Sequence, residues 1–161
     1  MSPEALFTKL VGRWEGSCRT WFTPDELADE SPVRGEFVAL LDGRFLRHVY
    51  RGSMQGRPRH GEELLGFDSV EQRYQIAWLD DFHMNTALMF SQGPPLPRGF
   101  SVRGDYGVSA GEPRWGWRTA YELADDDRLV ITAFNIFPDG REVRAVQTEY
   151  RRVAATGDDA R

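Results

Sequence analysis

The sequence has almost no cysteine and no long apolar run, and both shortages narrow the class of protein. Cys18 is the only cysteine among 161 residues, so no disulfide can form within the chain. That usage is typical of a reducing compartment, and we expect a cytoplasmic, bacterial protein. No apolar run is long enough to span a bilayer, and the residues around Glu4 and Lys9 lack the basic start and apolar core of a signal peptide. No membrane partner is therefore expected.

The chain also lacks an excess of basic residues. Asp and Glu number 25 against 20 Lys and Arg, which gives a formal net charge of -5. The longest block of like charge is the short run from Asp125 to Asp127. Nucleic acids select for clustered Lys and Arg, so we expect no nucleic-acid partner.

Motifs that would identify a reaction are missing as well. There is no Gly-x-Ser-x-Gly, no Gly-rich phosphate loop followed by a helix, and no histidine next to Cys18. Asp80, Asp81 and His83 combine metal-ligand types, but their spacing matches no established metal site. We predict no metal, and these charges are better explained as a solvated turn.

The first informative feature that is present is a change of period near the N-terminus. Ser2 before Pro3 is a helix start, because serine caps free N–H groups and proline fits the first helical position. Gly12 ends this helix, and the run Gly12 to Gly16, of the form G-x-W-x-G around Trp14, begins an alternating strand. The apolar face of the predicted helix comprises Leu6, Phe7, Leu10 and Val11.

After this strand, turn signals recur about every ten residues, which is the rhythm of an antiparallel meander. Further strands are predicted near 33–42, 44–54, 60–68, 73–81, 85–92, 99–108, 114–124, 128–138 and 141–153. The predicted fold is all-β: a single antiparallel, lipocalin-like closed barrel of about ten strands with a short N-terminal helix. The barrel domain covers residues 1–153, and residues 154–161 are predicted to be a disordered tail.

Turn chemistry supports this strand order. Asp42-Gly43 and Asp139-Gly140 are predicted two-residue hairpin turns, in which both residues have positive φ. Gly56 to Pro58 and Ser69 to Gln72 are predicted to close two more hairpins. The segment from Gly93 to Arg98 contains three prolines, which remove ladder donors, so it is predicted to be a loop at the barrel rim.

The alternation along the strands indicates which side chains point inward. His48 and Tyr50 share a face with Leu46, and other aromatic residues share inward faces on later strands. Trp14 is predicted to close the barrel floor and to form a wall of any cavity. Aromatic walls with a few polar groups are the usual composition of a ligand pocket. The candidate ligand-binding residues are Trp14, His48, Tyr50, Trp78, Asp80, Trp117 and Tyr121.

Several short segments together resemble a known family. They are residues 10–16, 43–46, 50–52, 65–68 and 148–152, spread over nearly the whole chain. The chain resembles a bacterial domain-of-unknown-function family of lipocalin-like (calycin) barrels, distant kin of nitrobindin and the fatty-acid-binding proteins. The resemblance implies a barrel that can hold a small molecule, and it implies no particular activity.

The nitrobindin relationship implies haem held by a histidine near the end of the last strand. The predicted last strand, Arg141 to Val153, contains no His, Cys or Met, although Tyr150 is a possible iron ligand. The three histidines, His48, His60 and His83, lie much earlier. We therefore predict no haem and no other cofactor.

Three functions remain open from the sequence. The first is a carrier or sensor that binds a small hydrophobic or aromatic molecule inside the barrel. The second is a barrel enzyme that isomerises or cyclises a small substrate, with His48 as the candidate catalytic acid or base and Asp80 or Tyr50 as its partner. The third is an oligomeric structural barrel, a homodimer that pairs through Phe134 and Ile136.

Overall fold

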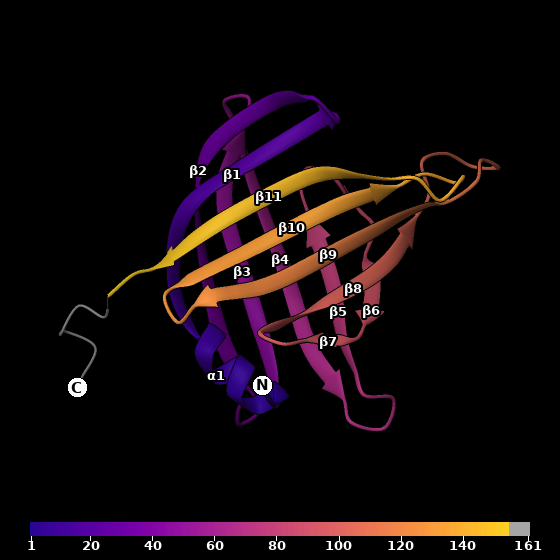
Figure 1. The fold of residues 1–161 in the computed structure, drawn as a ribbon. Coiled ribbons are helices and arrows are strands. Elements are labelled where there is room, and N and C mark those ends of the chain that lie inside the picture. The colour runs from indigo at the N-terminus through magenta and orange to yellow at the C-terminus, as the bar shows by residue number, and fades with distance from the viewer. Residues whose placement is uncertain (155–161) are drawn as a thin grey trace.

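The chain folds into a closed antiparallel barrel with a short helix at one end (Figure 1). The computed structural model describes residues 1–154. Neighbouring strands pair in the order β6-β5-β4-β3-β2-β1-β11-β10-β9-β8, and a pairing between β6 and β8 closes the circle of ten strands. The predicted fold class is confirmed. The elements are α1 (Pro3–Leu10), β1 (Gly12–Thr23), β2 (Glu26–Leu40), β3 (Phe45–Met54), β4 (Arg57–Asp68), β5 (Arg73–Asp80), β6 (Met89–Gly93), β7 (Pro95–Leu96), β8 (Gly99–Tyr106), β9 (Trp115–Asp125), β10 (Arg128–Ile136) and β11 (Glu142–Arg152).

Helix α1 forms where the capping residues predict it. The Ser2 side chain accepts a hydrogen bond from the Ala5 N–H at 3.2 Å, which satisfies one of the free donors of the first turn. Leu6, Phe7 and Leu10 are buried, and the helix lies at the lower end of the barrel in Figure 1. Val11, predicted on the same apolar face, is exposed beyond the end of the helix.

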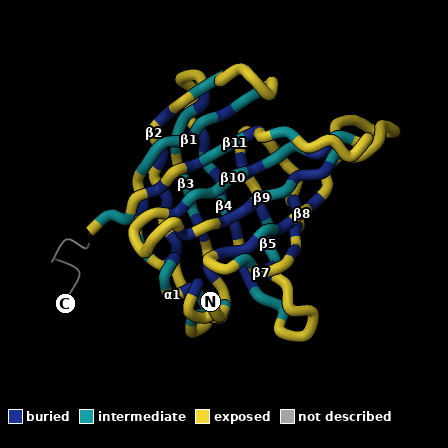
Figure 2. Tube along the Cα trace, in the orientation of Figure 1, coloured by how far each residue is buried: buried dark blue, intermediate teal, exposed yellow. Residues whose placement is uncertain are grey.

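The strands alternate between buried and exposed positions, as a sheet with one solvated face requires (Figure 2). On β5 the buried residues are Tyr74, Ile76, Trp78 and Asp80. The strand predicted over 33–42 is longer than expected, because β2 starts at Glu26. Residues 26–32 pair with β1 but not with β3, so this part of the hairpin extends past its neighbours. It shows little apolar alternation, because no barrel interior lies behind its outer end.

Two turns differ from the sequence prediction. At Asp139-Gly140 only Gly140 has positive φ, and its N–H donates to the Phe137 carbonyl at 2.8 Å. The connection is a turn followed by one left-handed glycine rather than a two-residue hairpin. At Asp42-Gly43 both residues do have positive φ, but Leu41 has it too, and the loop spans residues 41–44.

The proline-rich segment is not entirely a loop. Pro95 and Leu96 form β7, which pairs with Gly99 and Phe100 of β8 outside the ring of ten strands. A proline fits at this edge, because an edge position does not need every ladder donor. The strand predicted over 85–92 starts later, at Met89, because residues 81–86 form turns.

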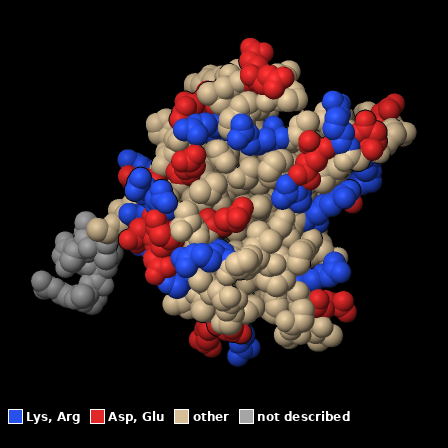
Figure 3. All heavy atoms as spheres, viewed as in Figure 1, with Lys and Arg blue, Asp and Glu red and all other residues tan. Residues whose placement is uncertain are grey.

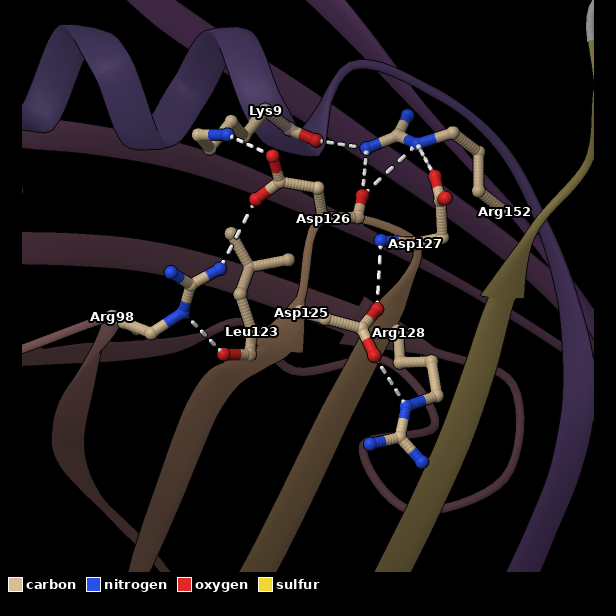
Figure 4. Close-up of polar contacts among 8 residues, drawn as sticks. All are labelled: Lys9, Arg98, Leu123, Asp125, Asp126, Asp127, Arg128 and Arg152. Atoms are coloured by element: carbon tan, nitrogen blue, oxygen red, sulfur yellow. Dashed lines mark hydrogen bonds and ion pairs between the residues drawn. The ribbon is translucent and has the colours of Figure 1, made fainter.

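Arg152 joins helix α1 to the turn between β9 and β10 (Figure 4). Its guanidinium donates to the carbonyls of Lys9, Val11 and Asp126, and it lies 4.3 Å from the centre of the Trp14 ring. The side-chain carboxylate of Asp126 accepts hydrogen bonds from Lys9 Nζ at 2.6 Å and from an Arg98 nitrogen at 3.1 Å. These hydrogen bonds lower the pKa of Asp126, which is exposed. The helix is thereby attached to strands that are distant in sequence.

The outer surface carries both charge signs, interspersed over the face that Figure 3 shows. The residues predicted to pair two barrels do not form an exposed apolar patch. Ile136 is buried, and Phe134 is covered by the Arg118 guanidinium at 4.1 Å from the ring centre. A bulge between Ala133 and Phe134 shifts the alternation on β10, which explains why its faces cannot be assigned from sequence. The predicted tail falls almost wholly on residues 155–161, outside the described residues.

Candidate functional site

The barrel interior contains a cavity of about 70 Å³ in the half of the barrel away from α1. Inward-facing side chains from most of the strands line it. Five of the seven candidate residues lie on it: His48, Tyr50, Trp78, Trp117 and Tyr121. The polar lining also includes Arg59, Glu63, His83, Ser91, Thr119, Thr148 and Tyr150. The structure thus brings residues of distant strands around one space.

Strand β4 supplies two charged residues that the sequence reasoning missed. Arg59, Gly61, Glu63 and Leu65 alternate inward along β4 and are all buried. Charged residues are rarely buried, so they are easily assigned to the outer face. Leu65 could have indicated their orientation. Side chains of a strand alternate between its two faces, so the face that buries Leu65 also contains Glu63 and Arg59.

Glu63 is the centre of a buried hydrogen-bond network. Its carboxylate lies 2.6 Å from His48 Nδ1, and the Tyr121 hydroxyl donates to it at 2.6 Å. An ionised carboxylate only accepts hydrogen bonds, so with Glu63 ionised the proton of this contact is on His48 Nδ1. Burial and the neighbouring Glu63 raise the pKa of Tyr121 well above its usual value, so its hydroxyl keeps its proton.

His48 is held on two sides, and its second ring nitrogen remains open. Its ring stacks on Phe37 with centroids 4.0 Å apart. The residue is only 2% exposed, and its Nε2 has no hydrogen-bond partner among residues 1–154. A buried polar atom without a partner is costly, so this nitrogen requires either water or a ligand.

Two glycines make this arrangement sterically possible. A Cβ on Gly61 would lie 2.1 Å from the Tyr50 hydroxyl oxygen. A Cβ on Gly35 would lie 2.6 Å from the Tyr150 hydroxyl oxygen and 3.0 Å from His48 Nε2. Any larger residue at either position would displace the side chains that line the cavity.

Arg59 is a buried cation with few partners. It is 5% exposed, and one terminal nitrogen donates to Cys18 Sγ at 2.9 Å. Its Nε has no hydrogen-bond partner, and within residues 1–154 no carboxylate forms an ion pair with it. The guanidinium carbon lies 5.7 Å from the centre of the Tyr50 ring. Arg59 therefore contributes a buried positive charge to the cavity that has no ion pair within residues 1–154, although the more distant charge of Asp80 acts on it.

Aromatic residues form the neighbouring part of the cavity wall. Trp78 Nε1 donates to the Tyr50 hydroxyl at 2.9 Å, and the Trp78 and Trp117 rings stack with centroids 5.7 Å apart. His83 packs against both tryptophans at 5.7 Å. Its side chain is 24% exposed, so it lies between the cavity and solvent.

Asp80 has a different role from the one predicted. It does not line the cavity, and the carboxylate partner of His48 is Glu63. Asp80 accepts hydrogen bonds from the backbone N–H groups of His83 and Met84 and lies 2.8 Å from His83 Nδ1. Burial raises the pKa of Asp80, but the hydrogen bonds and charge of His83 outweigh it, and the pKa falls below 3.8. Asp80 therefore positions His83.

Trp14 also lies outside the cavity lining. It is fully buried near α1, where its Nε1 donates to the Leu10 carbonyl at 2.8 Å. Tyr150, 6.5 Å away between ring centroids, does line the cavity. Trp14 thus packs the floor of the barrel below the cavity, because its strand position is next to the helix.

The size of the cavity limits what it holds without rearrangement. An apolar cavity of about 150 Å³ accepts benzene, and the space here is about half of that. A haem would have to displace the aromatic walls. Within residues 1–154, no three His, Cys, Asp or Glu side chains gather to hold a metal ion. The same part of the chain contains no helix long and apolar enough to cross a membrane.

Comparison with known proteins shows the fold and the family. No curated protein matches the chain. An S-type phycobiliprotein lyase, CPES from Guillardia theta, is similar in structure with a TM-score of 0.64 at 14% identity, over 97% of this chain and 95% of that one. A DUF3598-family protein of unknown function from Nostoc punctiforme aligns over 95% of this chain and all of that one, with a TM-score of 0.28 at 9% identity. The model of a family described as "Protein of unknown function (DUF1579)" matches residues 2–152, so the chain belongs to the DUF1579 family.

Proposed function

We propose that this protein binds a small molecule in the half of its barrel that lies away from α1. The observation that carries the proposal is a cavity with aromatic walls in which two buried polar atoms, His48 Nε2 and Arg59 Nε, have no protein partner. Protein interiors satisfy nearly all buried polar groups, so each exception requires an explanation, and a bound molecule is one such explanation. A few directed polar groups in an otherwise apolar pocket are typical of ligand sites. Similarity in fold to a phycobiliprotein lyase is consistent with this proposal.

The bound molecule is expected to be compact, with a flat or apolar part. Trp78 and Trp117, whose rings stack on each other, line the cavity together with the apolar residues Met89, Val102 and Ile131. Such surfaces favour apolar or aromatic groups through dispersion and area burial. A ligand larger than the present space requires movement of His83, the side chain that lies between the cavity and solvent.

A cavity-filling variant tests this proposal. Ala133 is buried on the cavity wall, so Ala133→Leu fills the space, whereas Ala77→Leu places the same group on the outer face. Aromatic probes such as indole and phenol are larger than the present space, so they enter only if His83 moves. We expect them to raise the melting temperature of the wild type and of Ala77→Leu, and to leave that of Ala133→Leu unchanged. Equal shifts in all three proteins would contradict binding inside the barrel.

A second candidate function, proton transfer, is favoured by one specific observation. His48 has the arrangement of an oriented base: Nδ1 lies 2.6 Å from Glu63, and Nε2, in a side chain that lines the cavity, has no hydrogen-bond partner among residues 1–154. A carboxylate that fixes the tautomer of a histidine is the arrangement that activates a general base. This dyad differs from the predicted pair of His48 with Asp80.

Exchange of carbon-bound hydrogen tests the second candidate. Acetone is small enough for the cavity, and a general base accelerates exchange of its methyl hydrogens in heavy water. The wild type and His60→Gln, a variant of an outer-face histidine, are expected to accelerate the exchange, and His48→Gln is not. Identical rates for all three proteins, followed by NMR, would argue against proton transfer.

A further inference from the structure

We propose that the ligand of this barrel is a compact organic acid whose carboxylate is bound by Arg59. This inference rests on the proposed function, because it names the chemical class of the molecule in the same cavity. Its basis is the charge distribution in the interior and the hydrogen-bonding capacity that the protein leaves unused.

Arg59 differs from the arginines on the outer surface because it is buried. Arg118 and Arg47, for example, form ion pairs with Glu142 and Glu62 on the outer surface. Arg59 is 5% exposed, and its one hydrogen bond in the described structure goes to a sulfur atom, a weak acceptor. An arginine keeps its charge under all ordinary conditions, so burial without a direct counter-charge is unfavourable. A ligand carboxylate would supply that charge.

The neighbouring acids are already engaged. Glu63 lies in the same cavity, but its oxygens are occupied by His48 Nδ1 and the Tyr121 hydroxyl. Asp80 is hydrogen-bonded to His83 and to two backbone N–H groups. Each of these acids therefore has a local partner, whereas Arg59, which lines the cavity, has a buried Nε–H without a partner. A guanidinium binds a carboxylate through two parallel hydrogen bonds, which requires such a free edge.

The other walls suit the rest of such an acid. The stacked Trp78 and Trp117 accept an apolar or aromatic group, and His48 Nε2 provides a second polar contact. The volume of about 70 Å³ restricts the enclosed part to a few non-hydrogen atoms. A longer remainder would extend past His83 toward solvent.

Matched acid and amide probes test the assignment. Propanoate is compared with propanamide, and benzoate with benzamide, by isothermal titration calorimetry on the wild type. We expect each acid to bind about tenfold more tightly than its amide, because a charged hydrogen bond to arginine is stronger than a neutral one. Arg59→Gln should remove this preference while amide affinity persists. Arg57→Gln, a variant of an exposed arginine on the same strand, should retain it.

The outcomes distinguish failure of carboxylate binding by Arg59 from failure of small-molecule binding in the cavity. Equal affinity for acid and amide, with binding lost in Ala133→Leu, would overturn the role of Arg59 and leave cavity binding intact. An acid preference that survives Arg59→Gln would also overturn it. Absence of binding by all four probes, or binding unaffected by Ala133→Leu, would overturn the proposed function as well. Arg59→Lys keeps the charge without the paired donors; it should give an intermediate preference, and it replaces Arg59→Gln if that variant fails to fold.

Discussion

The two halves of the barrel interior obey the same alternation but differ in what they contain. Beside α1, the interior is filled by fully buried apolar and aromatic groups such as Trp14, Tyr74 and Phe100. The Tyr74 ring stacks on Phe100 at 4.4 Å, and Phe7 of the helix packs against Tyr74 at 6.0 Å. Close contact of this kind is what gives protein cores their stability.

The half away from the helix contains buried charge and free volume. Arg59, Glu63 and His48 project into it, and about 70 Å³ remains unfilled. Such groups cost stability unless they are paired. The comparison separates a packed half, which stabilises the barrel, from a polar half, where we propose that a small molecule binds.

The largest expected effect is alkaline unfolding, which involves both halves. Burial raises the pKa of all five tyrosines above 10.0; it raises that of Tyr74, in the packed half, to about 12, and it raises that of Tyr121, in the polar half, well above its usual value. The unfolded chain loses these protons near pH 10, so stability is complete below that pH and falls as the pH rises above it. Tyrosinate absorbance should be small in the folded protein at pH 10 and large in urea. A tyrosinate absorbance at pH 10 that is as large in the folded protein as in urea would contradict this.

Replacing one tryptophan in each half should show how differently the two halves are packed. Trp14→Ala should destabilise the protein by about 3–5 kcal/mol, because it leaves a dry hole in the packed half. Trp78→Ala should cost less, since water can occupy the enlarged polar cavity and find hydrogen-bond partners there. Urea unfolding of both variants measures the difference. Equal losses would show that the two halves are packed alike.

Within the polar half, the role of Glu63 can be isolated. Glu63→Gln should cost about 1–3 kcal/mol, because an amide cannot replace the carboxylate between His48 and Tyr121. Glu62→Gln changes the preceding residue, which faces outward and forms an ion pair with Arg47 at 2.7 Å. This change should lower the free energy of unfolding by about 0–1 kcal/mol. Denaturant midpoints compare the two. A larger loss for Glu62→Gln would refute the importance of the buried network.

The smallest effect is expected at the surface of the packed half. Lys9→Gln removes the 2.6 Å ion pair with the exposed Asp126 but leaves the contacts of Arg152 to the helix backbone. Exposed ion pairs are screened by solvent, so the melting temperature should not change measurably. A clear decrease would show that this pair, rather than Arg152 alone, attaches α1 to the barrel.

Much of the site could be predicted, and the failures share one cause. His48, Tyr50, Trp78, Trp117 and Tyr121 were predicted from alternation and lie on the cavity. Arg59 and Glu63 were missed because the burial of a charge depends on partners from other strands, here Cys18, His48 and Tyr121. Asp80 was assigned the right strand face, but its carboxylate turns to the backbone of His83 and Met84. The order of residues in the sequence does not show which hydrogen-bond partner a side chain has in the folded protein.

The sequence by itself determined the class of fold. The change of period at Gly12, the turns and the alternation of β-strands suffice for a helix followed by an antiparallel barrel, since local propensity and burial of one face dictate both. Only the tertiary structure decided which part of that barrel is filled. The register of β4 against β3 and β5 brings Glu63 opposite His48 and Trp78, and Gly35 and Gly61 leave room for the rings beside them. Cavity volume depends on how side chains from distant strands pack together, and no local pattern encodes it.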